Sequence, residues 1–169
     1  HGNAKDSAVF ALGDRVTSWQ GATYAYDSDG NRSEKTVGST HTTYTWSAGG
    51  ELLSVSNGTT TVSYDYDAEG QLVRRKTNGV VDRYFLWDNG QLVAEFDSSA
   101  TTKRNEFAYQ PGVDQPLARI PNGGSIQFFQ LDGRGNVAGL ASGTTAIQSL
   151  RFGACGDVER QVGDSLADT

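Results

Sequence analysis

The nine residues YDYDAEGQL, at positions 64–72, contain the signals of one β-hairpin. Side chains two residues apart in a strand point to the same face, so Tyr64 and Tyr66 share a face. Asp67 then opens a turn, because its carboxylate accepts hydrogen bonds from backbone N–H groups just ahead of it. Gly70 closes the turn in the left-handed conformation, and the residues after it return as a second strand.

This arrangement recurs with a period of 20 residues over most of the chain. In each copy two aromatic or large apolar residues stand two apart and a glycine follows four residues after the second. The repeat positions are Tyr24, Tyr26, Gly30, Tyr44, Trp46, Gly50, Tyr64, Tyr66, Gly70, Tyr84, Leu86, Gly90, Phe129, Leu131, Gly135, Leu150, Phe152 and Gly156. Six copies of one unit predict a repeat protein in which each unit packs on its neighbours.

The turns between units carry the strongest hairpin signal, an Asn-Gly pair, which begins at residues 57, 78, 89 and 122. Residues 59–66 alternate and are mostly β-branched or aromatic, which favours a strand, and no helical period occurs anywhere. We therefore predict an all-β fold. Tandem antiparallel β-hairpins, with a dozen or more short strands, would form one extended, curled or spiral sheet.

The frame breaks after Gly90, because the next glycine of the series follows 45 rather than 40 residues later. Phe107 and Tyr109 fit a further unit, whose turn is replaced by residues 110–116. The three prolines of the chain fall in this region, which predicts a loop or a sheet edge rather than a central strand. The predicted organisation is regular repeats over 1–106 and divergent repeats over 107–169.

Composition narrows the classes of function. The formal net charge is −6 and the pI is about 4.8, whereas a nucleic-acid-binding surface is basic. The one basic cluster, residues 74–76, is expected to be a solvated strand face. No apolar run approaches the roughly 18 residues of a transmembrane helix. The single cysteine, Cys155, excludes an intramolecular disulfide. Nucleic acid and a membrane span are not expected.

Four segments carry a family resemblance. Residues 24–32 (YAYDSDGNR) and 64–72 resemble the YD-repeat signature, written YxYDxxGxL with a period near 20. Residues 129–137 (FQLDGRGNV) and 151–158 (RFGACGDV) resemble the start of the Rhs-associated core. The resemblance implies a spiral β-sheet, which in relatives forms a hollow shell around a toxic domain. Similar repeats occur in bacterial wall-associated proteins, insecticidal toxin complexes and teneurin adhesion receptors.

The sequence offers no constellation for catalysis. Residues 27–31 (DSDGN) lack the glycine and glutamate spacing of a helix-loop-helix calcium site, which favours a structural turn. Cys155 would need a histidine base, and the chain has only His1 and His41. The acidic residues sit at repeat-equivalent turns rather than in a dedicated acid–base pair. We predict no enzyme activity, no cofactor and no metal.

Trp87 is the most informative deviation from the repeat. It occupies the position of the turn aspartate in other units, so alternation places it on the face opposite Tyr84 and Leu86. An exposed tryptophan there could stack on a sugar ring or a partner. The alternative is that Trp87 packs against a neighbouring repeat.

The predicted function is a non-catalytic scaffold segment of an exported bacterial YD-repeat or Rhs protein, secreted or at the cell surface. Its partners would be other parts of the same protein or an enclosed toxin domain. One alternative is a module that binds a cell-surface glycan or a partner adhesin. Another is a fibre that self-associates through its unpaired sheet edges.

Overall fold

The computed structural model describes residues 8–111, 115–152 and 158–162, and side chains for 8–111 and 115–150. The described residues form strands and no helix, as predicted. The strands are β1 Val9–Ala11, β2 Arg15–Trp19, β3 Ala22–Tyr26, β4 Arg32–Val37, β5 Thr40–Trp46, β6 Leu52–Ser56, β7 Thr61–Tyr66, β8 Leu72–Thr77, β9 Val80–Asp88, β10 Gln91–Phe96, β11 Lys103–Tyr109, β12 Pro116–Pro121, β13 Gln127–Leu131, β14 Val137–Ser142, β15 Thr145–Phe152 and β16 Val158–Val162.

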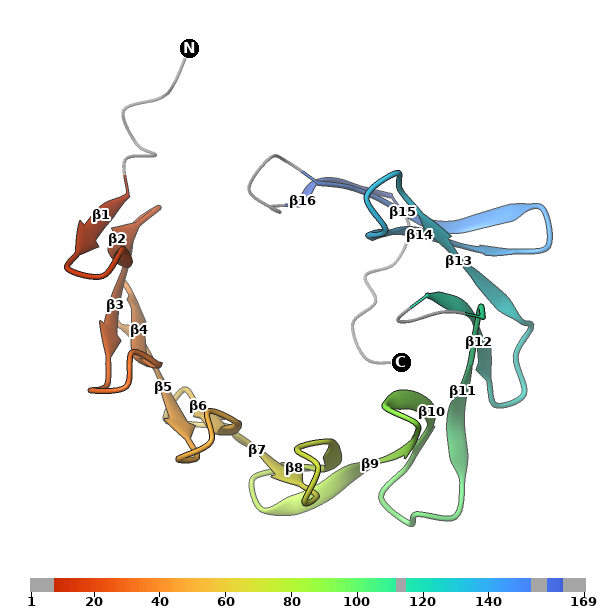
Figure 1. The fold of residues 1–169 in the computed structure, drawn as a ribbon, viewed down its shortest axis with the longest axis horizontal. Coiled ribbons are helices and arrows are strands. Elements are labelled where there is room, and N and C mark those ends of the chain that lie inside the picture. The colour runs from red at the N-terminus through yellow and green to blue at the C-terminus, as the bar shows by residue number, and fades with distance from the viewer. Residues whose placement is uncertain (1–7, 112–114, 153–157, 163–169) are drawn as a thin grey trace. The chain divides into compact units, whose positions relative to one another are not determined.

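The sixteen strands hydrogen-bond in chain order, each to the strand before and the strand after it. Every pairing whose register is resolved is antiparallel, so the predicted array of tandem hairpins is confirmed (Figure 1). The chain divides into two units, His1–Arg83 and Tyr84–Thr169, with the boundary inside β9. Each unit is described by itself below.

The hairpin loops of the first unit form as the sequence predicts. Asp67 Oδ1 accepts hydrogen bonds from the backbone N–H groups of Glu69 (3.0 Å) and Gln71 (2.8 Å). Gly70 donates its N–H to the carbonyl of Asp67 and has a φ of +79°, in the left-handed region. The loop that begins at Ser47 uses the serine hydroxyl instead of a carboxylate. These bonds satisfy the backbone groups that the tight turn would leave unpaired.

A β-bulge lies next to each of these loops. In the β7–β8 hairpin Tyr66 pairs with Leu72 and Asp65 pairs with Arg74, so Val73 is the additional residue. The β3–β4 and β5–β6 hairpins shift register at the corresponding place. Bulges increase the local right-handed twist, and a periodic bulge twists each hairpin in the same way.

Few side chains are fully buried, because each hairpin packs mainly on its neighbours along the sheet. Among the residues with described side chains, the buried apolar ones are Ala22, Ala94, Ala118, Leu140 and Ala141. Most aromatic residues are half-buried. This burial pattern fits a repeat array in which each unit is stabilised by its nearest neighbours.

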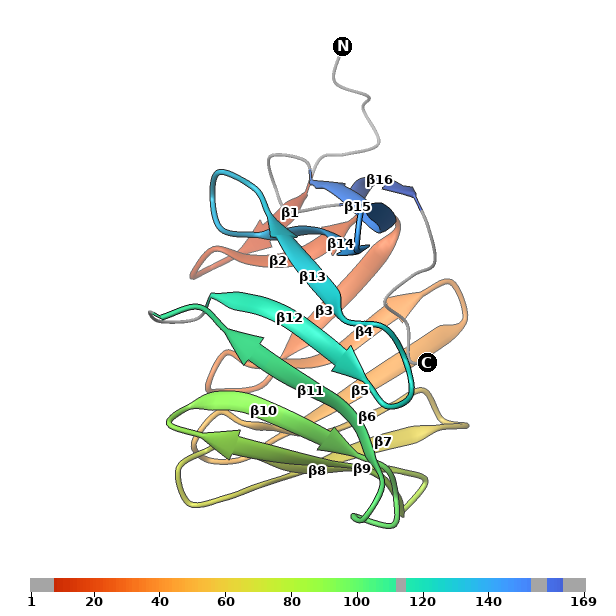
Figure 2. The same cartoon turned by 90° about the vertical axis from the view of Figure 1, so that its right-hand side faces the viewer.

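The proline-rich part of the second unit corrects one prediction (Figure 2). Pro116 and Pro121 are the first and last residues of β12, which pairs with β11 on one side and β13 on the other. The expectation of a loop or sheet edge was therefore wrong for residues 116–121, whereas Gln110, Pro111 and Gln115 lie outside any strand, as predicted. Proline is tolerated at a strand terminus, because the missing N–H there removes little of the ladder.

No helix in the described part of the chain has the length and hydropathy needed to cross a membrane.

Candidate functional site: a face of aromatic clasps

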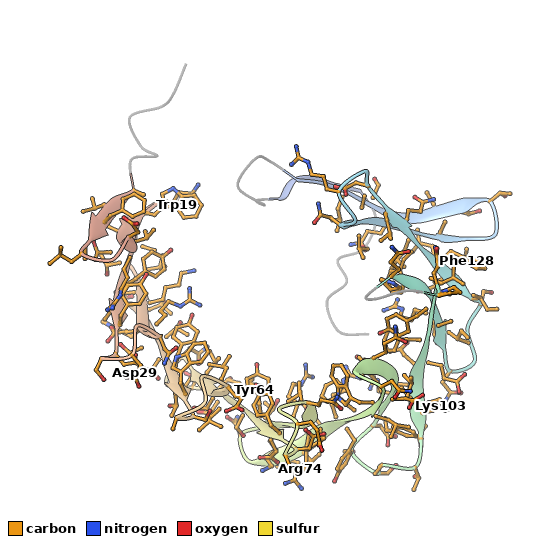
Figure 3. The ribbon with its side chains drawn as sticks, viewed as in Figure 1. Trp19, Asp29, Tyr64, Arg74, Lys103 and Phe128 are labelled. Atoms are coloured by element: carbon orange, nitrogen blue, oxygen red, sulfur yellow. The ribbon has the colours of Figure 1, made fainter. Side chains whose placement is uncertain are left out.

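One face of the first unit carries the aromatic residues of the repeat, and we call it the tyrosine face. Its members come from three consecutive hairpins: Tyr24, Tyr26, Tyr44, Trp46, Tyr64 and Tyr66. Figure 3 shows Tyr64 and Arg74 on opposite sides of the sheet, in agreement with the pairing of Arg74 with Asp65. Alternation along β7 therefore places its two tyrosines on one face and Asp65, with its partner Arg74, on the other.

The second aromatic residue of four such pairs, the fourth being Phe107 and Tyr109 of the second unit, donates a hydrogen bond to a backbone carbonyl of the preceding strand. We call this contact an aromatic clasp. Clasps among the described residues are Tyr26 Oη to Val16 O (2.7 Å), Trp46 Nε1 to Arg32 O (2.8 Å), Tyr66 Oη to Leu52 O (2.9 Å) and Tyr109 Oη to Leu92 O (3.0 Å). Tyrosine and tryptophan are interchangeable here because each joins an apolar ring to a polar N–H or O–H donor.

The clasps lie where the strands of successive hairpins diverge. Backbone pairing between β6 and β7 covers Ser54–Ser56 and Thr61–Ser63 and stops before Leu52 and Tyr66. The carbonyl of Leu52 would lack a ladder partner at this point, and the hydroxyl of Tyr66 supplies one. The clasp thus joins one hairpin to the next beyond the end of their shared ladder. The sequence predicted the positions of these residues but not this bond.

Arginine replaces the repeat leucine in one hairpin and stays on the tyrosine face. The guanidinium of Arg32 lies 4.3 Å from the ring centre of Tyr44 and 5.9 Å from that of Tyr24. Arg15 lies 5.8 Å from the ring of Tyr26. These cation–π contacts add an electrostatic attraction between neighbouring hairpins.

Register in the β9–β10 hairpin corrects the placement of Trp87. Trp87 pairs with Leu92, as Tyr66 pairs with Leu72, and Phe85 pairs with Glu95, as Tyr64 pairs with Arg75. The frame therefore slips by one residue in β9. The strand equivalents of the tyrosine pair are Phe85 and Trp87 rather than Tyr84 and Leu86.

The slip follows from a shorter turn. Asp88 pairs with Gln91, so only Asn89 and Gly90 form the turn, both with positive φ. Trp87 is consequently a half-buried strand residue instead of an exposed turn residue, whereas Leu86 is 51% exposed. Contact of Trp87 with a glycan or partner stays a prediction.

The basic cluster of the sequence is divided between the two faces of β8. Asp65 forms ion pairs with Arg74 and with Lys76 (2.8 Å to Lys76 Nζ). These cations lower the pKa of the Asp65 carboxyl, chiefly through the hydrogen bond from Lys76. Arg75 points to the tyrosine face and pairs with Asp82 at 3.0 Å. The cluster therefore does not form a continuous basic surface.

The turn carboxylates are occupied by their own loops. Asp27 Oδ1 accepts hydrogen bonds from the N–H groups of Asp29 (3.0 Å) and Asn31 (2.8 Å). At the equivalent loop, hydrogen bonds from Asn136 and Arg134 lower the pKa of Asp132. Over the described residues, no group of three or more His, Cys, Asp or Glu side chains is suited to hold a metal ion.

Of the cysteine and histidines considered as a nucleophile and base, only His41 lies among the described residues. His41 Nδ1 lies 2.7 Å from Glu34 Oε1, and this contact lowers the pKa of Glu34. Cys155 and Gly156 lie outside the described residues, and Phe152 is described only by its backbone.

The remaining repeat glycines, Gly30, Gly50, Gly90 and Gly135, have the positive φ that their turns require.

The hairpin order, the aspartate loops and the aromatic positions together are those of a YD-repeat array. The teneurin YD-shell family model matches residues 1–87. The chain belongs to the teneurin YD-shell family. This confirms the resemblance that the repeat motif indicated. No curated protein matches the chain.

Solved structures of toxin complexes are similar to this YD-shell chain. One is a Tc holotoxin pore of Photorhabdus luminescens, with 16% identity, a TM-score of 0.42 and coverage of 70% of this chain and 6% of that chain. A second is the TcdB2-TccC3-TEV complex, with 15% identity, a TM-score of 0.39 and coverage of 83% and 10%. The chain thus spans about a tenth or less of the length of these chains.

Proposed function

We propose that this YD-shell chain is a non-catalytic wall segment of an exported bacterial protein, and that the complete wall encloses or displays another domain. The observation that supports this most strongly is the aromatic clasp. It recurs at Tyr26, Trp46 and Tyr66 and ties each hairpin to the one before it. Contacts of this kind extend a sheet by repetition and require no specialised site.

The exposed apolar residues of β1 also support a role inside a larger wall. Val9 is 55% exposed and Phe10 is 59% exposed, on a strand that pairs only with β2 among the described residues. Apolar side chains this exposed, on a strand edge with unpaired N–H and C=O groups, favour association with another strand. In the proposed wall a further hairpin of the same protein covers this edge.

Cryo-electron microscopy of the native full-length gene product tests the proposal. The expected map shows these strands as part of a continuous sheet that surrounds or carries a further domain. A native protein in which the strands belong to no larger sheet contradicts it. Intact mass of the same preparation provides an independent check, because a wall segment belongs to a chain far larger than 18.1 kDa.

Sedimentation of the isolated chain separates the wall from the self-associating fibre. In the wall hypothesis, other parts of the same protein cover the sheet edges. The isolated segment is then expected to form no ordered filaments. Ordered, concentration-dependent filaments with a repeating subunit would favour the fibre and count against the wall.

A further inference from the structure

A cavity of about 380 Å³ lies within the second unit, over β11, β12 and β13. Its lining is polar and includes three basic side chains. The lining residues are Asp97, Thr102, Lys103, Arg104, Asn105, Arg119, Pro121, Asn122 and Gln127. The volume is in the range of pockets that hold small organic ligands and exceeds what a single inorganic ion fills.

The strand register explains why the polar groups meet at this place. Asn105 pairs with Pro121, and Arg119 pairs with Gln127 on its other side. Directly paired residues share a face of the sheet, and so do residues two apart, which brings Asn105, Arg119 and Gln127 to one surface. The three residues come from three consecutive strands, so the sheet backbone holds their spacing.

Arg119 is the best-positioned basic group. Its Nε and Nη2 atoms donate to Gln127 Oε1 at 3.0 and 2.6 Å. These two bonds fix the plane of the guanidinium and leave Nη1 free to donate elsewhere. A guanidinium held in this way loses little conformational entropy when it binds a carboxylate or phosphate.

The residues that line the cavity include more basic than acidic side chains. Lys103 forms an ion pair with Glu106, and Asp97 is the one carboxylate of the lining. Hydrogen bonds from Ser99 to Asp97 lower the pKa of this carboxyl, which keeps it ionised. Within the described residues, Arg104 and Arg119 have no carboxylate partner. The lining therefore contains two arginines without a carboxylate partner among the described residues and one carboxylate, Asp97, while the carboxylate of Glu95 lies beside them, bonded to Asn105.

The amides provide polar recognition beside the charge. Asn105 is 8% exposed, and its Nδ2 donates to Glu95 Oε2 at 2.8 Å, so its Oδ1 is directed elsewhere. Gln127 accepts from Arg119 through Oε1, which leaves its Nε2 as a donor. Such an acceptor and donor suit hydroxyl groups on a ligand.

We propose that this cavity binds a small organic oxyanion that carries hydroxyl groups. The oxyanion is either a carboxylate, as in a hydroxy acid, or a phosphate ester, as in a sugar phosphate, and it pairs with Arg119 and Arg104. The proposal is independent of the shell function, because it concerns residues of the second unit alone.

Isothermal titration of the purified chain with citrate, glucose 6-phosphate, inorganic phosphate and glycerol tests the site. Citrate tests the carboxylate source and glucose 6-phosphate tests the phosphate ester. At least one of these two is expected to bind, with an affinity at least about tenfold above that of inorganic phosphate and with no binding of glycerol. No binding of either organic anion at about 10 mM, or equal binding of inorganic phosphate, overturns the proposal.

Variants assign the binding to the cavity. Arg119→Gln should weaken the affinity at least about tenfold, because it removes a charge-assisted hydrogen bond. Arg104→Gln is the second variant, and its affinity is measured in the same way if Arg119→Gln fails to fold. The matched control is Arg134→Gln, which removes the same charge from an exposed loop outside the cavity. Unchanged affinity in a folded Arg119→Gln or Arg104→Gln protein, or equal weakening in Arg134→Gln, contradicts the assignment.

Discussion

The β7–β8 and β9–β10 hairpins share the same glycine position but use it differently. In β7–β8, the segment 67–71 forms a five-residue loop around an aspartate carboxylate. In β9–β10, the turn contains only Asn89 and Gly90, and β9 is nine residues long. Five residues separate the pair Tyr66–Leu72, but only four separate the equivalent pair Trp87–Leu92. This difference of one residue shifts every side chain in β9 by one place relative to β10. The comparison teaches that pairing register, rather than the 20-residue period, determines which aromatic residue takes the clasp position.

The largest effect is expected at Trp87. Because Trp87 is a half-buried strand residue opposite Leu92, Trp87→Ala should lower the free energy of unfolding by about 2–3 kcal/mol. Leu86→Ala is the control, since Leu86 is 51% exposed, and should cost less than about 1 kcal/mol. Chemical denaturation followed by circular dichroism measures both. If Trp87→Ala leaves the free energy of unfolding unchanged, or if Leu86→Ala lowers it more, Trp87 is a turn residue.

The aspartate loop of β7–β8 is tested by Gly70→Ala. Gly70 has a φ of +79°, so a Cβ should cost about 1–2 kcal/mol although no backbone atom obstructs it. Gly133→Ala is the matched change, because Gly133 has an ordinary φ and open space around its Cβ position. Thermal unfolding should separate the two variants clearly. Equal melting temperatures would contradict the left-handed assignment.

The clasp itself is tested by removing one hydroxyl group. Tyr66→Phe deletes the bond to the carbonyl of Leu52 and should cost about 1 kcal/mol. Tyr64→Phe is the control, since the hydroxyl of Tyr64 has no hydrogen-bond partner among the described residues. Hydrogen exchange near Leu52 and Tyr66 should also rise in Tyr66→Phe alone. Identical stability of the two variants would show that the clasp contributes nothing.

The smallest effect concerns acid stability. Hydrogen bonds from Asn136 and Arg134 hold the pKa of Asp132 below its usual value of 3.8. A depressed pKa contributes stability above the pKa of the unfolded chain, and this contribution is lost as pH falls through the folded value. The melting temperature should therefore fall between about pH 4 and pH 2, and less steeply in Asp132→Asn. An unchanged slope in the variant would exclude this loop as a source of the pH dependence.

Much of the fold was predictable from the sequence because the repeat combines several local signals. Alternation placed Tyr64 and Tyr66 on one face, and the turn chemistry of Asp67 and Gly70 was as expected. The antiparallel order followed because short turns can join only neighbouring strands.

Three features were beyond sequence reasoning, each for a physical reason. The register of β9 is shifted by one residue relative to the 20-residue frame. The Asn89-Gly90 pair favours a turn in either register, so the sequence does not distinguish the two. The strand at β12 depends on tertiary pairing that places Pro116 and Pro121 at its ends. The clasps join side chains to carbonyls of the preceding strand, such as Tyr66 to Leu52, and no local pattern encodes that contact.

The most direct test of register control is the set of cross-strand backbone contacts in the β9–β10 hairpin, measured by nuclear Overhauser effects. The account predicts contacts between the backbones of Phe85 and Glu95 and of Trp87 and Leu92. The unbroken 20-residue frame instead requires Tyr84 opposite Glu95 and Leu86 opposite Leu92, by analogy with β7–β8. Observing that second set would contradict the account and return Trp87 to the turn.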